Sequence, residues 1–547
     1  MDFVNNANDN AIESLNDNKD CTENDKTPGF QSSANKNKKI HDVLYGYIEI
    51  TPLMSRIIDT PEFQRLRDIK QLGPVHFVFP SATHTRFEHS IGVSYLAQKM
   101  CESIVKNYSD CKNNDKPVLN DRDIELYRIA ALIHDIGHGP YSHLYDDNIV
   151  KNGVHHEERG IMIFKQMVKR YTLSLTPEEE ETIINYVDPP KDCVNCWRYQ
   201  IIANKFNGID VDKLDYIQRD CYHLGLKYAC DFSRIIEMVN VKQILDRNND
   251  TNNNAIVLSW PEKIKYDIYS MFSTRYRLHK QIYEHHAVKS YEPYIVNILK
   301  KITSEFNIQD SKNNNESDLK KFLTLTDSTV HSQLYNLSKL EHYKKFNEFP
   351  INRFNKPKLI GEIIGNKKDE QNIMDDLNKF IEKSKEQINQ IVVNIGAGCS
   401  SSRTSSNESF SDIMLNKVFN IKFTATRSLI GFSSSENGIN PLQNVYCYGK
   451  KNYSLTKEQY NKSSVGDDFC YPNNMNSSFI IPPREFQELI CRVYLKIDYD
   501  SYEFNMMNVF GENKFDEYNE NTFSDIVFLK ELLVDGIKEN FSKSFYK

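Results

Sequence analysis

Two histidines and two carboxylates in this sequence have the residue types and spacing of a metal site. His134 and Asp135 are adjacent, and the segments TRFEHS and NGIDVDKLDYIQRDC supply two further candidate ligands, His89 and Asp212. The set offers two nitrogen and two oxygen donors, which suits iron, manganese, zinc or cobalt and leaves positions open for water and substrate. Such a metal lowers the pKa of bound water and polarises a phosphoryl oxygen. This metal quartet therefore predicts a centre that activates water.

A dense group of histidines follows the quartet in the sequence. His138 and His143 lie in the motif HDIGHGPYSH, and His155 and His156 come soon after, so that five histidines fall within 22 residues counted from His134. A single histidine is more often a satisfied core residue, and one His-Asp dipeptide alone carries little information. Because so many histidines beside glycine and proline would pack a core poorly, the group indicates an active site.

Helices must position these side chains. Asp123 is a candidate N-cap for a helix over 124–133, which delivers the His-Asp pair to its carboxyl end, where the glycines and proline of GHGP stop it. Apolar residues at helical spacing predict two more helices, over 91–104 and 161–168. The chemistry is therefore expected at the ends of packed helices.

The composition divides the chain into three parts. Residues 1–37 are rich in Asn, Asp, Lys and Ser, which predicts a disordered tail. Residues 38–341 are predicted to form a mostly helical, metal-dependent catalytic domain. Residues 342–547 are predicted to form a smaller α+β lobe for regulation or oligomerisation, with flexible insertions near 396–412 and 450–478.

The expected C-terminal lobe combines short β-rich pieces with one helix. The pieces IVVNI, NVYCY and CRVYLKI predict strands, and an amphipathic helix is expected over 524–541.

The overall composition narrows the class of protein. The 547 residues are 39% hydrophobic and 26% charged, which excludes a wholly disordered or coiled-coil chain. The formal net charge of -7 does not favour coating of nucleic acid or of an anionic membrane, so a polyanionic ligand must meet a local basic site. No apolar run has the length of a membrane span, and the first residues do not form a signal peptide. We expect an intracellular protein, in the nucleus or cytoplasm, whose cysteines, including Cys193 and Cys196, are reduced thiols.

Five sequence segments carry a family resemblance. They are, in order, IEITPLMSRIIDTPEFQRLRDIKQLG, FPSATHTRFEHSIGVSYLA, HDIGHGPYSHLYD, NGIDVDKLDYIQRDCYHLG and STRYRLHKQIYEH. They resemble the HD-domain deoxynucleoside triphosphate triphosphohydrolases, above all the eukaryotic members that join a SAM domain to the HD domain. The resemblance is strong over 38–300 and implies a mostly α-helical HD-domain fold with a smaller α+β C-terminal lobe. Only a short polar tail precedes the HD region, so we do not expect the roles of a SAM domain here.

The resemblance implies a reaction and a proton donor. The quartet would hold a transition metal (Fe, Zn or Mn), and Mg would accompany the nucleotide phosphates. The family reaction is hydroxide attack at the α-phosphorus of a dNTP, which gives a deoxynucleoside and inorganic triphosphate. Departure of the 5′-oxygen needs a proton, and the matching histidines are His138, His143 and His156. We expect His143 to be the acid, with Asp146 orienting it or raising its pKa, and the other two to contact the triphosphate.

The resemblance also implies a set of substrate-binding residues. Lys213 and Arg275 would bind phosphate, Tyr216 would lie along the sugar, and Asp220 would reach its 3′-hydroxyl, because Asp212, Tyr216 and Asp220 share one helical face. Gln71 would share the 3′-hydroxyl, and Leu72 and Tyr283 would occupy the space of a ribose 2′-hydroxyl. Arg86 would stack on the base. The expected substrate set is Gln71, Leu72, Arg86, Lys213, Tyr216, Asp220, Arg275, His279 and Tyr283.

Two activator sites are implied in the same way. Asp59, Gln64 and Arg67 match a guanine-specific site for GTP; from the residues alone, Asp59 or Thr60 is a helix cap. Arg234, His285 and Lys496 match a second nucleotide site that drives tetramerisation in the family. Gln281 and His286 stand there in place of Arg and Lys, and Asp267 replaces an Asn, so this second site is expected to bind phosphate more weakly.

Three functions fit these residues. The first is a GTP-stimulated dNTP triphosphohydrolase that forms a nucleotide-dependent homotetramer. The second is another HD phosphohydrolase, either restricted to dGTP or of the phosphodiesterase type. The third is an inactive HD protein that binds nucleic acid, although the net charge does not indicate nucleic acid. The complete metal quartet disfavours the third, and Gln71, Tyr216 and Tyr283 around a sugar disfavour a phosphodiesterase.

Overall fold

The computed structural model describes residues 36–109, 119–150, 154–193, 196–227, 231–244, 256–305, 316–338, 357–398, 420–431, 445–448, 469–472, 487–498 and 534–546. The expected disordered tail lies outside these residues except for its last two positions, and the expected domain boundary at 341 lies outside them as well. Of the expected insertions, only 396–398 and 469–472 are described; the first ends a helix and the second is a strand.

The first half of the chain is a β-hairpin followed by helices. Its elements are β1 (Lys38–Asp42), β2 (Gly46–Ile50), α1 (Pro52–Ile58), α2 (Pro61–Gln64), α3 (Arg86–Ser109), α4 (Asp121–Ile133), α5 (His143–Asn148), α6 (His156–Tyr171), α7 (Pro177–Val187), α8 (Val211–His223) and α9 (Ser233–Glu237). The helices expected over 91–104, 124–133 and 161–168 are confirmed by α3, α4 and α6.

The start of α4 differs from the expectation. The N-cap is Asn120, whose side chain accepts the backbone N–H of Asp123 at 2.9 Å, while the Asp123 side chain accepts the backbone N–H of Asn120 at 2.9 Å. Asp123 is therefore the third residue of a capping box and not the N-cap itself. This reciprocal cap fixes the start of the helix that ends at the His-Asp pair.

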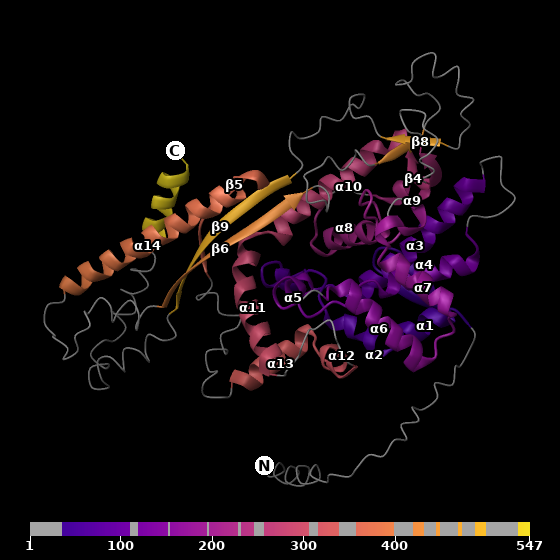
Figure 1. The fold of residues 1–547 in the computed structure, drawn as a ribbon, viewed down its shortest axis with the longest axis horizontal. Coiled ribbons are helices and arrows are strands. Elements are labelled where there is room, and N and C mark those ends of the chain that lie inside the picture. Colours follow the sequence, from indigo (N-terminus) through magenta and orange to yellow (C-terminus); the bar gives the residue numbers. More distant parts are fainter. Residues whose placement is uncertain are drawn as a thin grey trace, which may run out of the picture.

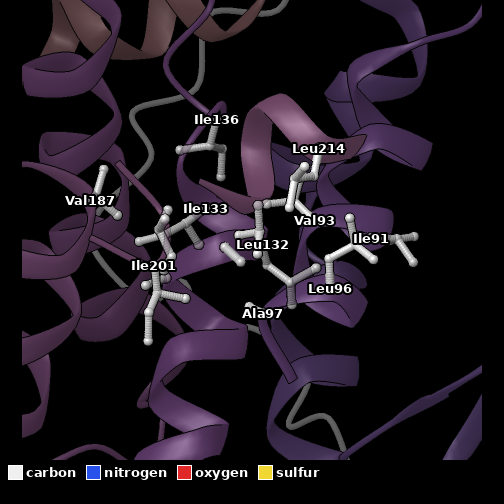
Figure 2. Close-up of a cluster of buried hydrophobic side chains, with 14 of the residues drawn as sticks. Ile91, Val93, Leu96, Ala97, Leu132, Ile133, Ile136, Val187, Ile201 and Leu214 are labelled. Carbon is white, nitrogen blue, oxygen red and sulfur yellow. The ribbon is translucent and has the colours of Figure 1, made fainter. Parts of the chain in front are cut away.

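Helices α3, α4 and α8 meet at the centre of the helical core. Ile91 and Val93 of α3, Leu132 of α4 and Leu214 of α8 are all at most 2% exposed, and Figure 2 shows them in one cluster with Ile136. Fully burying one such side chain contributes about 1.5–3 kcal/mol. Since α3 and α8 carry His89 and Asp212, and α4 ends directly before His134 and Asp135, the apolar core that fixes these helices also fixes the site.

The C-terminal part forms a sheet that is covered by helices. Strands β5 (Lys358–Gly365), β9 (Gln487–Asp498) and β6 (Asn420–Gly431) pair antiparallel in the order β5-β9-β6. Helix α14 (Glu370–Gly398) and the terminal helix over 534–545 pack with β9 in a second apolar core. Figure 1 shows this assembly at the end of the molecule away from α1 and α2. The expected α+β lobe is thus observed beside a helical HD-type part.

Three details of this part test the expected elements. The pieces NVYCY and CRVYLKI lie in β7 (Tyr446–Tyr448) and β9 as predicted. The strand expected for IVVNI is wrong, because residues 391–395 continue α14. The helix expected over 524–541 is found over 534–545, and residues 524–533 lie outside the described ranges.

Two strands from the second half of the chain join the helical part. A small closed barrel contains β3 (Asn240–Ile244), β4 (Ile256–Pro261), β7 and β8 (Phe469–Pro472). Strand β4 pairs in parallel with β7, and β3 pairs in parallel with β8. Residues after 342 therefore contribute to both parts of the molecule, so the C-terminal lobe is not closed upon itself.

A long helical segment connects the site to the C-terminal sheet. Helix α10 (Lys265–Leu278) passes through one π-helical turn (η6, His279–Tyr283) into α11 (His286–Glu305), and α12 (Glu316–Leu323) and α13 (Asp327–Ser338) follow. Figure 1 shows α11 between the sheet and α5. In the described parts of the chain we find no helix whose length and apolarity would let it span a membrane.

Candidate active site

The four predicted metal ligands converge on one point. His89 Nε2, from α3, lies 3.1 Å from Asp212 Oδ1 of α8 and 3.5 Å from Asp135 Oδ2. His134 Nε2, at the end of α4, lies 3.6 Å from the same Asp212 oxygen and 3.5 Å from Asp135 Oδ1. Donors that share one tetrahedral cation at about 2.1 Å are roughly 3.4 Å apart. The donor atoms of His89, His134 and Asp135 all lie within 4.8 Å of one another, and Asp212 lies beside both histidines, so this spacing suits one metal ion.

Both histidines present Nε2 to this point. His89 Nδ1 is bonded to Asp215 Oδ2 at 2.7 Å, and His134 Nδ1 to the carbonyl oxygen of Ala131 at 2.7 Å. These bonds fix the tautomer in which Nε2 has the free lone pair. His134 Nε2 is buried and has no hydrogen-bond partner within the described chain. An orphaned imidazole nitrogen facing carboxylates is the arrangement that a cation would complete.

The charges in and around the quartet favour the binding of a cation. Burial alone would lower the pKa of His89, but its bonds to Asp212 and Asp215 raise that pKa to about 10, so at neutral pH a metal would have to displace the proton on Nε2. Burial would raise the pKa of Asp135, yet Arg86 and His134 hold it well below its ordinary value. Burial would raise the pKa of Asp212 too, but its contacts with His134 and His89 hold it well below its ordinary value, so both carboxylates are ionised at neutral pH, as metal ligands must be.

A buried carboxylate network supports His89 from behind. Asp215 accepts two bonds from Arg219, at 2.8 and 2.9 Å, and one from the Tyr45 hydroxyl at 2.8 Å. Arg219 also pairs with Asp42 at 2.9 Å. These residues were not predicted. Asp215 lies one helical turn after Asp212, which is the signal that could have identified it.

The second histidine group lies directly beside the quartet. The rings of His138 and His156 stack with centroids 3.9 Å apart, and His143 is edge-on to His138 at 5.0 Å. The three side chains can offer nitrogen atoms within 4.8 Å of one another. His138 Nε2 is 3.3 Å from Asp135 Oδ1, so the two groups touch. A phosphate chain that reached the quartet would also meet these rings.

The structure changes the expected partner of Asp146. Its Oδ2 accepts a bond from Nδ1 of His156 at 2.9 Å, and its other oxygen pairs with Arg159. The carboxylate that we expected to orient His143 therefore orients His156, because helix α6 brings His156 and Arg159 to it. Desolvation by the surrounding rings and the nearby Arg86 lower the pKa of His143, although Asp135 and Asp146 act in the opposite direction and the side chain still reaches solvent.

Arg86 is held against the metal quartet. Its Nη1 lies 2.5 Å from Asp135 Oδ2, and its Nε donates to Ser142 Oγ at 2.9 Å. The side chain is only 3% exposed. The expected stacking of Arg86 on a base is therefore not supported, because the guanidinium is already engaged with a metal-site carboxylate.

One face of α8 brings three of the expected residues together. Asp212, Tyr216 and Asp220 follow each other at intervals of four along the helix. The Tyr216 hydroxyl accepts a bond from Arg275 Nε at 3.1 Å, and Asp220 accepts one from the Tyr283 hydroxyl. The predicted sugar and phosphate residues thus form a continuous row beside the metal quartet.

His84 is a site residue that was not predicted. Its Nε2 is 2.6 Å from Asp220 Oδ1, and its ring stacks on His223 with centroids 4.4 Å apart. Its backbone carbonyl accepts the N–H of Gln71 at 3.0 Å. Gln71 Oε1 is buried and has no hydrogen-bond partner in the described chain, so it can still accept a ligand hydroxyl. The sequence signal that could have identified His84 is its place in the segment FPSATHTRFEHS, which also contains Arg86 and His89.

The remaining substrate residues lie around this row. Lys213 Nζ is paired with Asp210 Oδ2 at 2.8 Å, so a phosphate would have to share the ammonium group. Leu72 is half-buried and packs on the main core. The His279 ring is 4.9 Å from the Tyr283 ring, and burial lowers the His279 pKa.

The C-terminal sheet holds the π-helical turn that carries His279 and Tyr283. A π-turn inside a longer helix is frequent at functional sites. The contacts from the sheet are those of Arg275 Nη1 with Gly431 O at 2.8 Å, Lys280 Nζ with Glu488 Oε2 at 2.7 Å, Arg492 Nη1 with Glu284 O at 2.8 Å, and Tyr494 Oη with His286 O at 2.9 Å. The sheet therefore supports the substrate side of the site.

Two of the three residues of the expected guanine site contact each other, and Gln64 Nε2 donates to the carbonyl oxygen of Ile58, the residue before Asp59, at 2.7 Å. Gln64 Oε1 accepts a bond from Arg67 Nε at 2.8 Å, and the Arg67 guanidinium lies over the Phe87 ring at 3.5 Å. Asp59 is 44% exposed and pairs with Lys38 at 3.3 Å. The N-cap of α2 is Thr60, so Asp59 does not cap that helix.

The expected second nucleotide site is less well supported. Arg234 is paired with Asp267 at 2.8 Å, which neutralises one of its expected cations. The His285 ring lies 5.5 Å from the Phe79 ring and 4.4 Å from the His286 ring. Lys496 lies in β9, but its side chain is outside the described part.

Comparisons with known proteins agree with the site. The HD domain family matches residues 86–193. The HD domain-containing protein L394 of Acanthamoeba polyphaga mimivirus is 34% identical over 424 residues, 74% of this chain and 84% of that protein. The deoxynucleoside triphosphate triphosphohydrolase SAMHD1 of Bos taurus is 34% identical over 338 residues, 54% of each chain. SAMHD1 of Homo sapiens is 36% identical over 275 residues, 45% of this chain and 42% of that protein.

The matches cover different shares of these relatives. The chain spans most of the viral protein but about half the length of the two SAMHD1 proteins. The family match contains the His-Asp pair at the end of α4, and it begins at the start of α3, which carries His89. The chain therefore belongs to the HD-domain family and is a SAMHD1-like member of it.

Proposed function

We propose that the protein hydrolyses deoxynucleoside triphosphates to a deoxynucleoside and inorganic triphosphate. The observation that carries this proposal is the metal quartet, in which each histidine Nε2 lies 3.1–3.6 Å from oxygens of Asp135 and Asp212, beside the row of Tyr216, Asp220, Arg275 and Tyr283. The similarity to SAMHD1 proteins supports the same reaction.

The residues of the chain have separate tasks in this proposal. A divalent metal held by the quartet would lower the pKa of a bound water and polarise the α-phosphoryl group. His143, which is exposed beside His138 and His156, is the candidate donor of a proton to the 5′-oxygen. Its low pKa in the free protein favours the neutral ring, and the negative charge of a bound triphosphate would raise that pKa. His156, oriented by Asp146, would contact the phosphates.

Selection of the deoxyribose would depend on the row along α8. Asp220 is held by His84 and Tyr283, so its carboxylate has a fixed orientation toward a 3′-hydroxyl. Tyr283 and Leu72 would leave no room for a 2′-hydroxyl. Arg275, bonded to Tyr216, would contribute charge to the phosphates.

Regulation by nucleotides is part of the same proposal. Asp59, Gln64 and Arg67 would bind the guanine of a GTP activator, and nucleotide binding would drive formation of a homotetramer. The support is the bond between Gln64 and Arg67, the bond of Gln64 to the carbonyl oxygen next to Asp59, and the exposure of Asp59. A second activator site at Arg234 and His285 would act more weakly, because Asp267 already neutralises Arg234.

The test is analysis of products from each of the four dNTPs, with Mn or Mg, with and without GTP. We expect a deoxynucleoside and triphosphate in equal amounts. Monophosphate would indicate a phosphodiesterase, turnover of dGTP alone would indicate a restricted hydrolase, and no turnover with either metal would indicate an inactive binding protein. The variant with both His134→Ala and Asp135→Ala is the control for the metal site and should have no activity.

A further inference from the structure

Two consecutive residues near the histidine group have a left-handed backbone. Tyr141 has φ 60° and Ser142 has φ 59°. Residues with side chains rarely adopt this conformation, and they keep it only where their surroundings enforce it. The carbonyl oxygen of Tyr141 also packs so closely on Gly73 that a Cβ at residue 73 would lie 2.6 Å away. Contacts with other parts of the chain must therefore hold this turn in its conformation.

Helix α13 holds the turn at two points. Asp327 Oδ1 accepts the backbone N–H of Tyr141 at 2.8 Å, and His331 Nε2 lies 3.0 Å from the Tyr141 hydroxyl. Asp327 and His331 are four residues apart, so they share one face of the helix. The second oxygen of Asp327 accepts the backbone N–H of Lys70 at 3.1 Å. One carboxylate, 1% exposed, thus joins the turn to the segment before Gln71.

Asp327 does not cap its own helix. Thr326 Oγ1 accepts the backbone N–H of Thr329 at 3.2 Å, and Thr329 Oγ1 accepts the backbone N–H of Thr326 at 2.7 Å. The start of the helix is docked by Asp68, which accepts the hydroxyls of Thr326 and Ser328 at 2.6 Å each. Since capping and docking are supplied by other residues, the Asp327 carboxylate is left to join the turn to Lys70, whose ammonium group also lies 3.8 Å from it.

The turn is connected to the metal quartet through one hydroxyl. Ser142 Oγ donates to the carbonyl oxygen of Lys70 at 2.7 Å and accepts from Arg86 Nε at 2.9 Å. Arg86 Nη1 in turn lies 2.5 Å from the metal-site carboxylate of Asp135. If the turn relaxed, the Ser142 hydroxyl would move away from Arg86, and Asp135 would lose its oriented partner.

We propose that Asp327 is a positioning residue for the metal centre, acting through the Tyr141–Ser142 turn and Arg86 on Asp135. It would not touch metal or substrate. The inference rests on the proposed function where turnover is measured. The expected loss of metal retention does not depend on that function, because metal binding by the quartet does not depend on which substrate is turned over.

The test compares Asp327→Asn with a matched variant, Asp68→Asn, at the same end of α13. Asparagine at 327 keeps the size of the side chain but can accept only one of the two amide bonds, whereas Asp68→Asn weakens docking without touching the turn. Each purified protein is loaded with Mn, exposed to a chelator and assayed for retained metal, for kcat and KM with dTTP, and for thermal unfolding. Ser142→Gly, which suits a positive φ and removes the hydroxyl, tests the connection to Arg86.

We expect Asp327→Asn and Ser142→Gly each to lower metal affinity and kcat by roughly ten-fold, the lower end of the range for outer partners of metal ligands, with KM little changed. The double variant should lose no more than the larger single loss, because both changes act through Arg86. Asp68→Asn should stay within about two-fold of the unmodified protein.

Three results would overturn the inference. These are full metal retention and kcat in Asp327→Asn, an equal loss in Asp68→Asn, or losses that multiply in the double variant. If the unmodified protein does not hydrolyse dTTP, the proposed function fails instead, and the comparison of metal retention still decides the role of Asp327.

Discussion

Asp215 accepts a hydrogen bond from the Nδ1 of His89 at 2.7 Å, so that a buried carboxylate stands behind a metal-site imidazole. Such a partner fixes the tautomer and increases the basicity of the ligand nitrogen. We predict that Asp215→Asn lowers metal affinity by about 10–100-fold. The measurement is metal content after equilibration with chelators of graded strength.

The control for this change is Asp188→Asn, which removes a carboxylate that pairs with Lys205 on the surface at 2.7 Å. Its metal affinity should equal that of the unmodified protein. Because Asp215→Asn also leaves the buried Arg219 with a weaker partner, circular dichroism must first show that the variant is folded. Unchanged metal affinity in a folded Asp215→Asn protein would remove the supporting role assigned to Asp215.

The metal quartet could be proposed from the sequence because the His-Asp pair stands beside a dense group of histidines and its other ligands lie in short, recognisable motifs. The residues that orient the ligands could not be predicted in this way. Tyr141 and Asp327 are 186 positions apart, and Asp42 meets Arg219 across 177 positions. Only packing brings such pairs together. Likewise, Arg86 was expected on the base because its motif did not show that Asp135 would engage it.

The elements of the fold could be predicted where the apolar spacing was regular. The prediction failed where the residue composition favoured one structure and tertiary packing favoured another. The segment IVVNI has the β-branched residues of a strand, yet it continues α14 to Gly398. Earlier in that helix, Leu377, Phe380 and Ile388 are buried at helical spacing and pack with β9. This packing favours the helical conformation over the strand that the local composition indicates. The pairing of β7 and β8 with β3 and β4 joins distant segments, which no local pattern could indicate.

Asp327 gives a prediction for pH-dependent stability. Burial raises its pKa to about 6, against the opposing effect of the bonds from Tyr141 and Lys70. The folded protein therefore binds this proton more tightly than the unfolded chain, whose carboxyl titrates near 3.8, and the stability contributed by the group is lost as the pH rises from about 4 to 6. The difference of about two pKa units corresponds to a change of about 3 kcal/mol in the free energy of unfolding.

Relative to the unmodified protein, Asp327→Asn should therefore gain stability as the pH rises over that window. The measurement is urea unfolding of both proteins at pH 4.5, 5.5 and 7.5. A difference in unfolding free energy that does not change with pH would contradict the raised pKa. If the variant is at least as stable as the unmodified protein at pH 7.5 and yet turns over more slowly, its loss of activity cannot be due to unfolding.

The ion pair between Lys280 and Glu488 should influence substrate binding. It ties the π-helical turn that carries Tyr283 to β9, at 2.7 Å, with both side chains partly exposed. An ion pair of this kind contributes about 0.2–1 kcal/mol, so Glu488→Ala should raise KM for dNTPs by up to about five-fold with little effect on kcat. Glu382→Ala, which removes an exposed pair with Lys385, is the control. Equal KM values in both variants would indicate that the sheet does not position the turn.

Tyr283 should control the choice between deoxyribose and ribose. Its hydroxyl bonds to Asp220, and its ring lies 4.9 Å from the His279 ring. Tyr283→Ala should raise turnover of ribonucleotides relative to deoxyribonucleotides, because it opens the space of the 2′-hydroxyl. Tyr283→Phe keeps the ring and should preserve the preference while weakening the support of Asp220. If the ratio of ribonucleotide to deoxyribonucleotide turnover is the same in the unmodified protein and in both variants, the sugar must lie elsewhere.

The proposed guanine site gives the last prediction. The Asp59 carboxylate can accept two hydrogen bonds from the N1–H and N2–H of guanine, whereas adenine presents an unprotonated N1 that would repel it. A bidentate base contact is worth roughly 1–3 kcal/mol, or about 5- to 150-fold in activator affinity. GTP should therefore stimulate hydrolysis of dTTP and ATP should not, and Asp59→Ala should remove this preference without loss of metal. The measurement is an initial-rate titration with each activator, alongside sedimentation to follow oligomer size.

The structure separates this effect from a general loss of stability. Thr60 caps α2 through its bond to the amide of Phe63, so the Asp59 side chain contributes a surface pair with Lys38, worth at most about 1 kcal/mol, and a bond from the Ser55 hydroxyl, each at 3.3 Å. Asp376→Ala removes a surface carboxylate paired with Lys379 at the same distance, 3.3 Å, and should leave the GTP response unchanged. Equal stimulation by GTP and ATP in the unmodified protein would reject the guanine site and leave the metal centre intact. A GTP preference that survives in Asp59→Ala would show that other residues read the base.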